Sequence, residues 1–425
     1  MARKNWYALD NAAKIYPPNT SEKSPFVFSF TARLNEEVDP ELLERALNLL
    51  LQHRPTFKTR LKRGIFWYYL EENNRPALVK PQPAHYLKQI VPESNNGYMF
   101  EVFYRRNTLT MNFHHSLTDG TGGVNFFLDL IFEYFKLCEY PVESEGILRP
   151  SASPHIIEES EDTFRKIDRK KTPSPAFESL AYKFRGTPFA YDGYGIMAGI
   201  CKTEQVKELA KKYDTTVTVY LAALYMYSIY RTCLEGKPVK NKQVKILVPI
   251  NLRKRFNSNT VRNFSLFTRL KHDFKDPITF EQCIELCKTQ MKAGLEPDVI
   301  DGIIHSNVKL EKNPLLMLTP LFLKDIIMKL VYSRVGENVQ SGDLSNIGLI
   351  KTPESFKGRL KDIVFVIGPT KTAQQNFTVI GYEDRLYIAS ARGYVETKIE
   401  REFFTHLSKN GVDVTVYSNF WEAEV

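Results

Sequence analysis

Apolar and polar positions alternate along the first part of the chain in two different periods. From Ser24 to Arg33, apolar side chains fall on every second position, at Phe26, Phe28, Phe30 and Ala32, which predicts a strand. Asp39 and Pro40 then form a helix start, with Asp39 as the cap. The apolar stripe of Leu43, Ala46, Leu47 and Leu50 predicts a helix to about His53.

The same two periods continue through the rest of the chain. They predict strands over 57–61, 65–70, 98–104, 108–113, 245–250, 376–382 and 385–391, and helices from 121 and over 206–212, 216–233 and 399–409. The segment 216–233 is apolar nearly all round, so we expect it to be buried. This alternation of strands and helices predicts an α/β fold, either mixed or in α+β layers.

One apolar stretch has an ambiguous pattern. The segment 314–332 (PLLMLTPLFLKDIIMKLVY) contains Pro320, Lys324, Asp325 and Lys329. We expect a buried helix of the second domain there. An apolar channel for the acceptor, or a patch that touches a membrane, stays open as an alternative.

The length of 425 residues suits two domains. Residues from about 139 to 187 are rich in proline, serine and charge, which is typical of a connection between domains. We therefore predict a first domain over 1–140, a crossover linker over 141–187 and a second domain over 188–425.

Charge and cysteine content narrow the function classes. The formal net charge is +9, which favours anionic partners such as phosphate-bearing co-substrates or acidic carrier proteins. Lysine and arginine are interleaved with acidic residues, and the densest basic cluster (165–171) resembles a solvated linker, so we expect no nucleic-acid partner. The five cysteines form no CxxC pair, which predicts free thiols and no metal site. Since we see neither an apolar leader nor an uncharged run of about 20 residues, we expect a cytoplasmic protein without a transmembrane segment.

The most informative motif is His114-His115-Ser116-Leu117-Thr118-Asp119-Gly120, between a predicted strand and a predicted helix. Neighbouring residues of a strand point to opposite faces, so His114 and His115 cannot bind one metal ion together. A histidine at a strand end, with an ordinary pKa near 6.5, is suited to accept a proton. Asp119 would pair with an arginine to fix the loop, and Gly120 would allow a backbone dihedral that other residues resist.

This motif resembles that of the chloramphenicol acetyltransferase-like superfamily, which includes condensation domains, phthiocerol-type diacyltransferases and alcohol acetyltransferases. Three further stretches are similar in order and spacing: 52–61 (QHRPTFKTRL), 248–253 (VPINLR) and 345–348 (SNIG). The resemblance covers about residues 5–410. The "DFGWG" motif of plant relatives is absent, which weakens a plant-type interpretation.

The resemblance implies two domains of similar topology in a V-shaped pseudo-dimer, with the site at their interface. It implies that His115 is the general base, that Asp119 is structural and paired with Arg253, and that His114 shapes the loop. Ser345 or Asn346 is a candidate hydrogen-bond donor to the oxyanion, or else a plain strand-end contact. Lys254 and Arg255 would contribute to a basic tunnel mouth, or would belong to a solvated loop.

The function implied is transfer of an acyl group from a thioester to an alcohol or amine, by a ternary complex on a monomer. Acyl-CoA or an acyl-phosphopantetheine would be the co-substrate, with a small-molecule acceptor and no bound cofactor or metal. Two alternatives remain: a condensation-type enzyme whose donor sits on an acyl-carrier protein, and a non-catalytic binding module of the same fold.

Overall fold

The computed structural model describes residues 5–149, 157–167, 178–189 and 193–419. Its strands are β1 (Trp6–Ala8), β2 (Val27–Leu34), β3 (Thr59–Arg63), β4 (Tyr68–Glu72), β5 (Val79–Pro81), β6 (Phe100–Arg105), β7 (Thr108–His114), β8 (Gly195–Lys202), β9 (Gln243–Asn251), β10 (Ser265–Asp273), β11 (Gly342–Leu349), β12 (Leu360–Ile367), β13 (Gln375–Tyr382), β14 (Arg385–Arg392) and β15 (Thr415–Ser418). Its α-helices are α1 (Tyr16–Asn19), α2 (Pro40–Gln52), α3 (Gly120–Leu137), α4 (Thr203–Lys212), α5 (Val217–Ile229), α6 (Arg253–Phe256), α7 (Phe280–Gly294), α8 (Pro297–Glu311), α9 (Pro314–Leu318), α10 (Leu321–Val331) and α11 (Lys398–Lys409).

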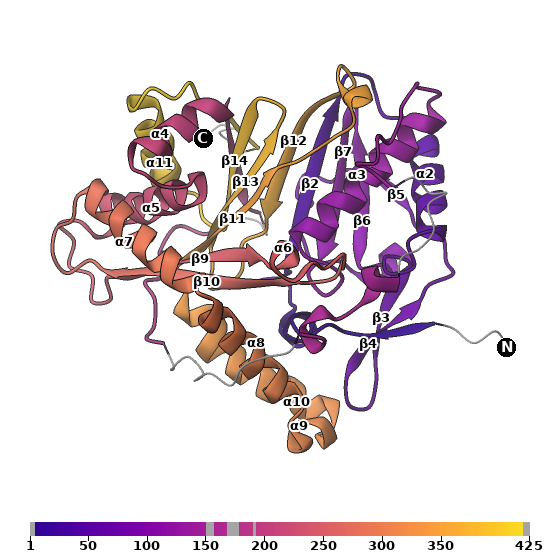
Figure 1. Cartoon of the computed structure of the whole chain (residues 1–425), viewed down its shortest axis with the longest axis horizontal. Coiled ribbons are helices and arrows are strands. Elements are labelled where there is room, and N and C mark those ends of the chain that lie inside the picture. Colours follow the sequence, from indigo (N-terminus) through magenta and orange to yellow (C-terminus); the bar gives the residue numbers. More distant parts are fainter. Residues whose placement is uncertain (1–4, 150–156, 168–177, 190–192, 420–425) are drawn as a thin grey trace.

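The first half of the chain builds a five-stranded sheet in the order β12-β2-β7-β6-β5, and α2 and α3 pack against it (Figure 1). The predicted helix start is present, since the Asp39 carboxylate accepts hydrogen bonds from the amides of Glu41 and Leu42. Strands β2 and β7 are antiparallel, and Val27 is paired with His114 at one end. The histidine motif therefore lies where this sheet ends.

The second half builds a seven-stranded sheet in the order β10-β9-β11-β13-β14-β8-β15. Helices α5, α7 and α11 pack on it, and α5 is almost entirely buried, as its apolar sequence predicted. Strand β11, which contains the Ser345–Gly348 stretch, is parallel to both of its neighbours, β9 and β13. A small third sheet, β1-β4-β3, flanks the first half.

Strand β12 links the two halves. It belongs by sequence to the predicted second domain, yet it pairs with β2 of the first sheet from Ile367 at Phe28 to Leu360 at Leu34. It also packs against β13 and β14 of the second sheet. The division at 141–187 therefore does not separate the two sheets completely.

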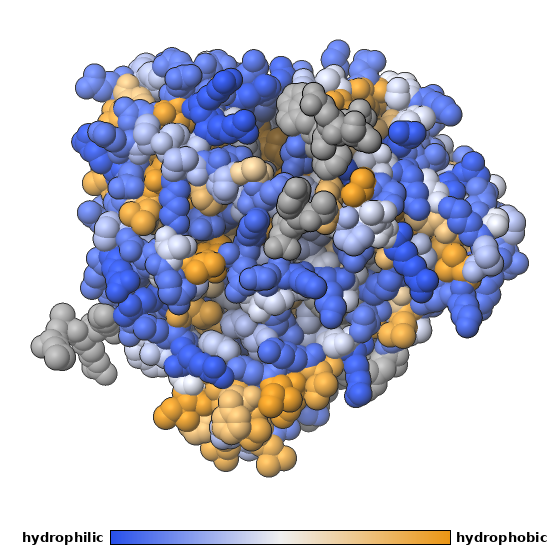
Figure 2. Space-filling model, turned by 180° about the vertical axis from the view of Figure 1, so that it is seen from behind, coloured by the Kyte–Doolittle hydropathy of each residue, from blue (hydrophilic) through white to orange (hydrophobic). Residues whose placement is uncertain are grey.

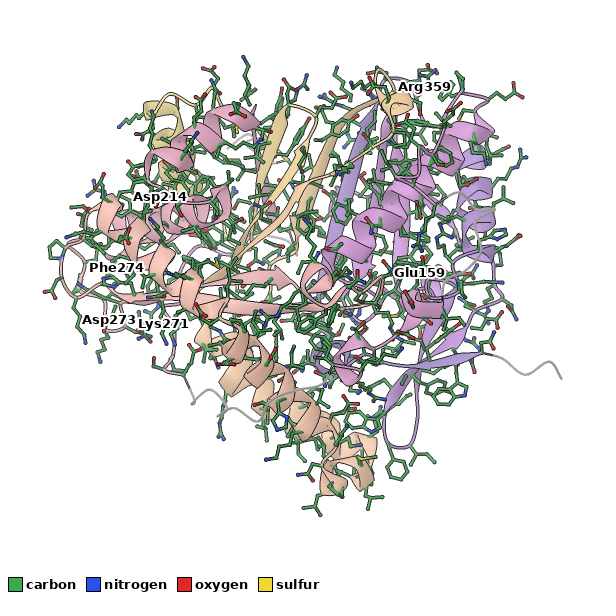
Figure 3. All side chains as sticks on the ribbon, in the orientation of Figure 1. Glu159, Asp214, Lys271, Asp273, Phe274 and Arg359 are labelled. Carbon is green, nitrogen blue, oxygen red and sulfur yellow. The ribbon has the colours of Figure 1, made fainter. Side chains whose placement is uncertain are left out.

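The hairpin of β9 and β10 makes a second link. Its two strands reach from the second sheet to the lower end of α3, so their connection, residues 252–264, meets the histidine motif (Figure 1). Lys271, Asp273 and Phe274 lie at the opposite, outer end of the hairpin (Figure 3).

The expectation for residues 314–332 was wrong. They form two short helices, α9 and α10, whose apolar side chains are mostly exposed. Pro320 separates the helices, and the side chains of α10 that turn inward include the charged Lys324. No helix in the described ranges is long and apolar enough to cross a membrane.

Candidate active site

The two histidines of the motif point to different surroundings, as strand alternation predicted. His114 is buried: its Nδ1 accepts a hydrogen bond from the Ser116 amide (3.1 Å), and its Nε2 lies 2.9 Å from Thr20 Oγ1. Because Nδ1 accepts, Nε2 carries the hydrogen and donates it to Thr20. Both ring nitrogens are thereby occupied, so His114 fixes the loop and has no nitrogen free for a substrate.

His115 is held by its backbone and by aromatic rings. Its amide donates to the Phe26 carbonyl (2.9 Å), and its carbonyl accepts from Asn263 Nδ2 (3.0 Å). The imidazole stacks on Tyr16 with ring centroids 5.0 Å apart, and lies 4.7 Å from the Phe28 ring. Its Nδ1 is buried with no hydrogen-bond partner in the described part of the chain. The ring is therefore fixed in place while its Nδ1 stays without a partner.

Burial sets the charge of both rings. Desolvation lowers the pKa of His114 to about 3, and the charge of His115 adds to that effect. Desolvation lowers the pKa of His115 to about 4, although the nearby Asp119 carboxylate acts in the opposite direction. His115 is consequently a neutral imidazole at neutral pH, the form that can accept a proton.

Asp119 is saturated with hydrogen bonds. Arg253 donates to both carboxylate oxygens at 2.9 Å, from Nη1 and Nη2, so the predicted ion pair between these two residues is present. The same carboxylate caps α3 by accepting from the Gly122 amide (3.0 Å), and it accepts from the Phe264 amide (2.9 Å). Because its carboxylate binds all these donors, Asp119 serves to hold α3 and the 252–264 connection together.

Arg253 in turn organises the 252–264 connection. Its Nε donates to the Thr260 carbonyl (2.8 Å), and Nη2 also donates to the Arg262 carbonyl (2.6 Å). A Cβ on Gly122 would lie 2.1 Å from the Val261 carbonyl oxygen, so only glycine lets α3 approach this connection. The buried Glu159, to the right of centre in Figure 3, holds the other side of this connection: its backbone carbonyl accepts from the Val261 amide (3.1 Å).

Gly120 has a different role from the predicted one. It is the first residue of α3, and it is not among the glycines with a positive φ. A Cβ at Gly120 would lie 2.7 Å from Cδ1 of Ile347 on β11. The glycine thus provides space where the two halves meet, and not an unusual dihedral.

The two oxyanion candidates on β11 face opposite ways. Asn346 donates to Thr218 Oγ1 on the α5 side (2.9 Å), and its Oδ1 accepts from the Gly348 amide (2.8 Å). Its amide is therefore engaged within the second half, on the α5 side of β11. Ser345 is buried and lies on the other face of β11, the face of Ile347. Of the two residues expected at a basic tunnel mouth, Lys254 is exposed, and Nη2 of Arg255 lies 3.7 Å from Oδ1 of Asp301.

Several residues around His115 had no sequence signal. Asn263 bridges the buried Asp10 carboxylate (3.2 Å) and the His115 carbonyl. Tyr16, on the four-residue α1, covers the imidazole. Asp343 shares the Ser345 face of β11, and burial raises the pKa of its carboxyl to about 7. These residues are brought together only by tertiary contacts.

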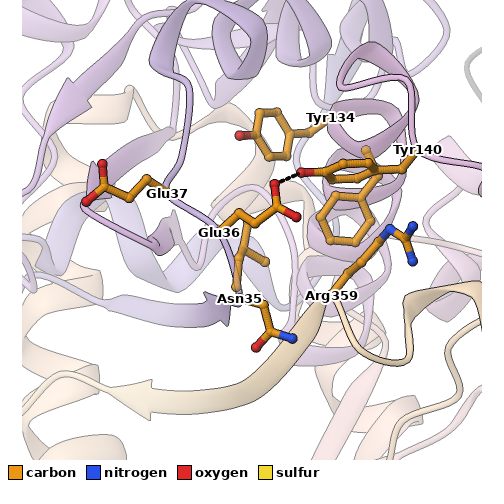
Figure 4. Close-up of a pocket in the computed structure, with 8 residues that line it drawn as sticks. Asn35, Glu36, Glu37, Tyr134, Tyr140 and Arg359 are labelled. Carbon is orange, nitrogen blue, oxygen red and sulfur yellow. Dashed lines mark hydrogen bonds between the residues drawn. The ribbon is translucent and has the colours of Figure 1, made fainter.

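Two other features do not join this site. Asn35, Glu36, Glu37, Tyr134, Tyr140 and Arg359 line a pocket at the end of β2 opposite His114 (Figure 4). There the Tyr140 hydroxyl donates to Glu36, and Arg359 lies 4.8 Å over the Tyr140 ring. Within the described ranges, no three histidine, cysteine or acidic side chains converge as metal ligands.

Comparison by sequence finds no matching family model and no matching curated protein. Comparison by structure finds several similar folds over nearly the full length. Polyketide synthase associated protein 5 from Mycobacterium tuberculosis has 15% identity and a TM-score of 0.61, with 95% of this chain and 98% of that chain covered.

Two further structures were solved with coenzyme A compounds. F. graminearum TRI101, complexed with coenzyme A and T-2 mycotoxin, has 10% identity and a TM-score of 0.63, covering 97% of this chain and 100% of its own. The starter condensation domain of rhizomide synthetase RzmA, in complex with C8-CoA, has 12% identity and a TM-score of 0.61, covering 97% and 98%. The resemblance seen in the sequence is thus confirmed at the level of the fold: this chain has the two-lobed fold of these solved structures, among them a condensation domain.

Proposed function

We propose that this protein is an acyltransferase, in which His115 acts as general base while an acyl group moves from a thioester to an alcohol or amine. The observation that carries the proposal is the state of His115. It is a neutral imidazole, fixed by its backbone and by Tyr16, and its buried Nδ1 has no hydrogen-bond partner in the described part of the chain.

The proton transfer follows from the accessibility of the ring. His115 Nδ1 is fully buried, so an acceptor reaches the imidazole through Nε2. Nε2 takes the proton of the hydroxyl or amine as its oxygen or nitrogen attacks the thioester carbonyl. General-base assistance of this kind contributes roughly 10²–10⁴-fold to the rate.

The rest of the reaction needs no residue that becomes acylated. The carbon–sulfur bond breaks when the tetrahedral intermediate collapses, and the leaving thiolate takes the proton back from His115. A thiol has a pKa near 8.5, so its thiolate leaves readily. We assign Ser345 as the donor to the oxyanion, because it is the oxyanion candidate on the face of β11 toward α3.

The donor we propose is an acyl-CoA or another acyl-phosphopantetheine. The structures of TRI101 and of the RzmA domain hold coenzyme A compounds on this fold. The formal charge of +9 favours a phosphate-bearing donor. Lys254, exposed beside Arg253, is available to meet its phosphates.

The test is a panel assay with purified protein, in which free thiol release is followed for several acyl-CoAs, each with and without alcohols and amines. We expect release that depends on both the donor and the acceptor, with an ester or amide detected by mass spectrometry. Transfer only from a carrier-bound acyl group would select the condensation-type alternative. Tight CoA binding without any transfer would select the non-catalytic one.

A further inference from the structure

A continuous set of apolar side chains projects from the lower end of the molecule. It belongs to the end of α8, to α9 and α10, and to the turn between β3 and β4, and Figure 2 shows its core as the orange region at the bottom. We call these residues the apolar tip: Leu310, Leu315, Met317, Leu318, Phe322, Leu323, Ile326, Ile327, Leu330, Val331, Ile65 and Phe66. Leu315 is 82% exposed and Ile65 is 77% exposed. Exposed apolar groupings of this kind mark interaction sites.

Helix α10 is inverted relative to an ordinary surface helix, because two of its charged side chains, Lys324 and Asp325, face the protein. Lys324 is buried: its Nζ donates to the Phe66 carbonyl (2.7 Å) and lies 3.7 Å over the Trp67 ring. Asp325 accepts from Tyr68 Oη and from Arg63, both at 3.0 Å. The polar groups therefore anchor the helix, and its apolar face is left outside.

The exposed charged residues in the segment that carries most of the apolar tip are all positive. Residues 309–334 contain two acids, and both are already paired: Asp325 as above, and Glu311 with Lys14 (2.5 Å) and Arg165. The exposed charged residues of the same segment are Lys309, Lys312, Lys329 and Arg334. None of these four has an ion pair among the described residues. The apolar tip is thus accompanied by uncompensated positive charge.

We propose that the apolar tip docks on the surface of a membrane that contains anionic lipids. Apolar side chains that enter the headgroup region, accompanied by lysines and arginines that meet lipid phosphates, are the combination that holds interfacial helices at a bilayer. Helices of 5 and 11 residues are too short to span it. A second copy of this chain fits less well, because a symmetric contact would bring the four cations against their own copies.

Docking there would place the site beside the bilayer. Helix α10 packs against α1, whose Tyr16 covers His115. Directly after α10, the ring centroid of Tyr332 lies 5.7 Å from that of Phe26. The proposal goes beyond the proposed function and does not depend on it, because docking needs no catalysis.

The experiment is co-sedimentation with vesicles of phosphatidylcholine alone or with about 30 mol% phosphatidylserine. We expect the wild type to bind the anionic vesicles, to bind less at high salt, and to bind neutral vesicles more weakly. Phe322→Ser/Leu330→Ser should reduce binding at least about tenfold, and Lys309→Glu/Lys312→Glu should abolish the preference for anionic lipid. Leu180→Ser is the matched control, because Leu180 is also exposed (62%) but lies outside the apolar tip.

Three results would overturn the proposal. The first is absence of vesicle binding by well-folded wild type, which would leave a protein partner as the occupant. The second is binding that the tip variants and the control variant share equally. The third is a wild-type dimer in sedimentation that Phe322→Ser/Leu330→Ser converts to a monomer. Acyl transfer in solution, with or without vesicles, bears only on the proposed function.

Discussion

At the scale of the residue, the site depends on the difference between two adjacent histidines. His114 has both ring nitrogens engaged, by Ser116 and by Thr20, whereas Nδ1 of His115 has no hydrogen-bond partner in the described ranges. Burial keeps both rings neutral. Unlike His114, His115 therefore combines a fixed position with a neutral ring that is not held at both nitrogens, which is what general-base catalysis requires.

The lowered pKa of His115 predicts an unusual pH profile. A base is active when deprotonated, so kcat/KM should stay constant as the pH falls from 8 to about 5, and should decline near pH 4 as His115 becomes protonated. Tyr16→Ala should admit water to the imidazole and move this decline upward, toward the ordinary pKa of about 6.5. Initial rates across the pH range measure both effects.

Tyr16→Phe is the control for that profile, because it keeps the ring that stacks on His115. It should leave the acid decline where the wild type has it. A Tyr16→Ala profile identical to the wild type would show that Tyr16 does not shield His115.

At the scale of the element, the ion pair between Asp119 and Arg253 joins the N-terminus of α3 to the 252–264 connection, and both side chains are largely shielded from solvent. The exposed fraction of the side chain is 7% for Asp119 and 12% for Arg253. Removing either partner leaves the other charge unpaired at a position with little access to solvent. Asp119→Asn and Arg253→Gln should each lower the free energy of unfolding by roughly 3–5 kcal/mol.

The double variant should recover part of that loss, since it removes both charges together. Denaturant titrations of the four proteins measure the coupling. Arg231 and Glu235, an exposed pair on one turn, provide the control cycle, with a coupling of about 0.5 kcal/mol or less. Strictly additive losses for Asp119 and Arg253 would show that the pair does not hold these elements together.

How far the sequence predicts the elements depends on the range of the interactions. The histidine motif, the Asp39 cap of α2 and the buried α5 are local patterns, and the structure contains them. The approach of Asn263 and Asp10 to His115 is long-range, so no window of sequence reveals it. Helix α10 was misjudged because apolar content does not tell which face meets the protein, and there the side chains that contact the protein include Lys324 and Asp325.

At the scale of the whole molecule, one chain supplies both sides of the site. His115 lies at the end of the first sheet, whereas Arg253 and Ser345 come from the second half. Strand β12 and the β9–β10 hairpin join the two halves across this region. The pairing of β12 with β2 of the first sheet could not be predicted from the sequence, because no local feature of β12 indicates which strand it pairs with.

A single chain with no acylated residue in its mechanism predicts direct transfer within a ternary complex. Initial-rate plots against donor at several acceptor concentrations should give intersecting lines, and specific activity should be independent of protein concentration. No acylated protein should form with donor alone. Parallel lines together with a stable acyl adduct on a cysteine or serine would contradict direct transfer.

The central claim is that the imidazole of His115 removes the acceptor's proton, and its most direct test is the turnover number of His115→Ala. With the donor and acceptor selected by the panel assay, kcat should fall by about 10²–10⁴-fold, while circular dichroism and the unfolding midpoint stay close to the wild type. His305→Ala, a histidine change on α8, should leave kcat unchanged. A His115→Ala protein that keeps more than about a tenth of wild-type kcat would contradict the account.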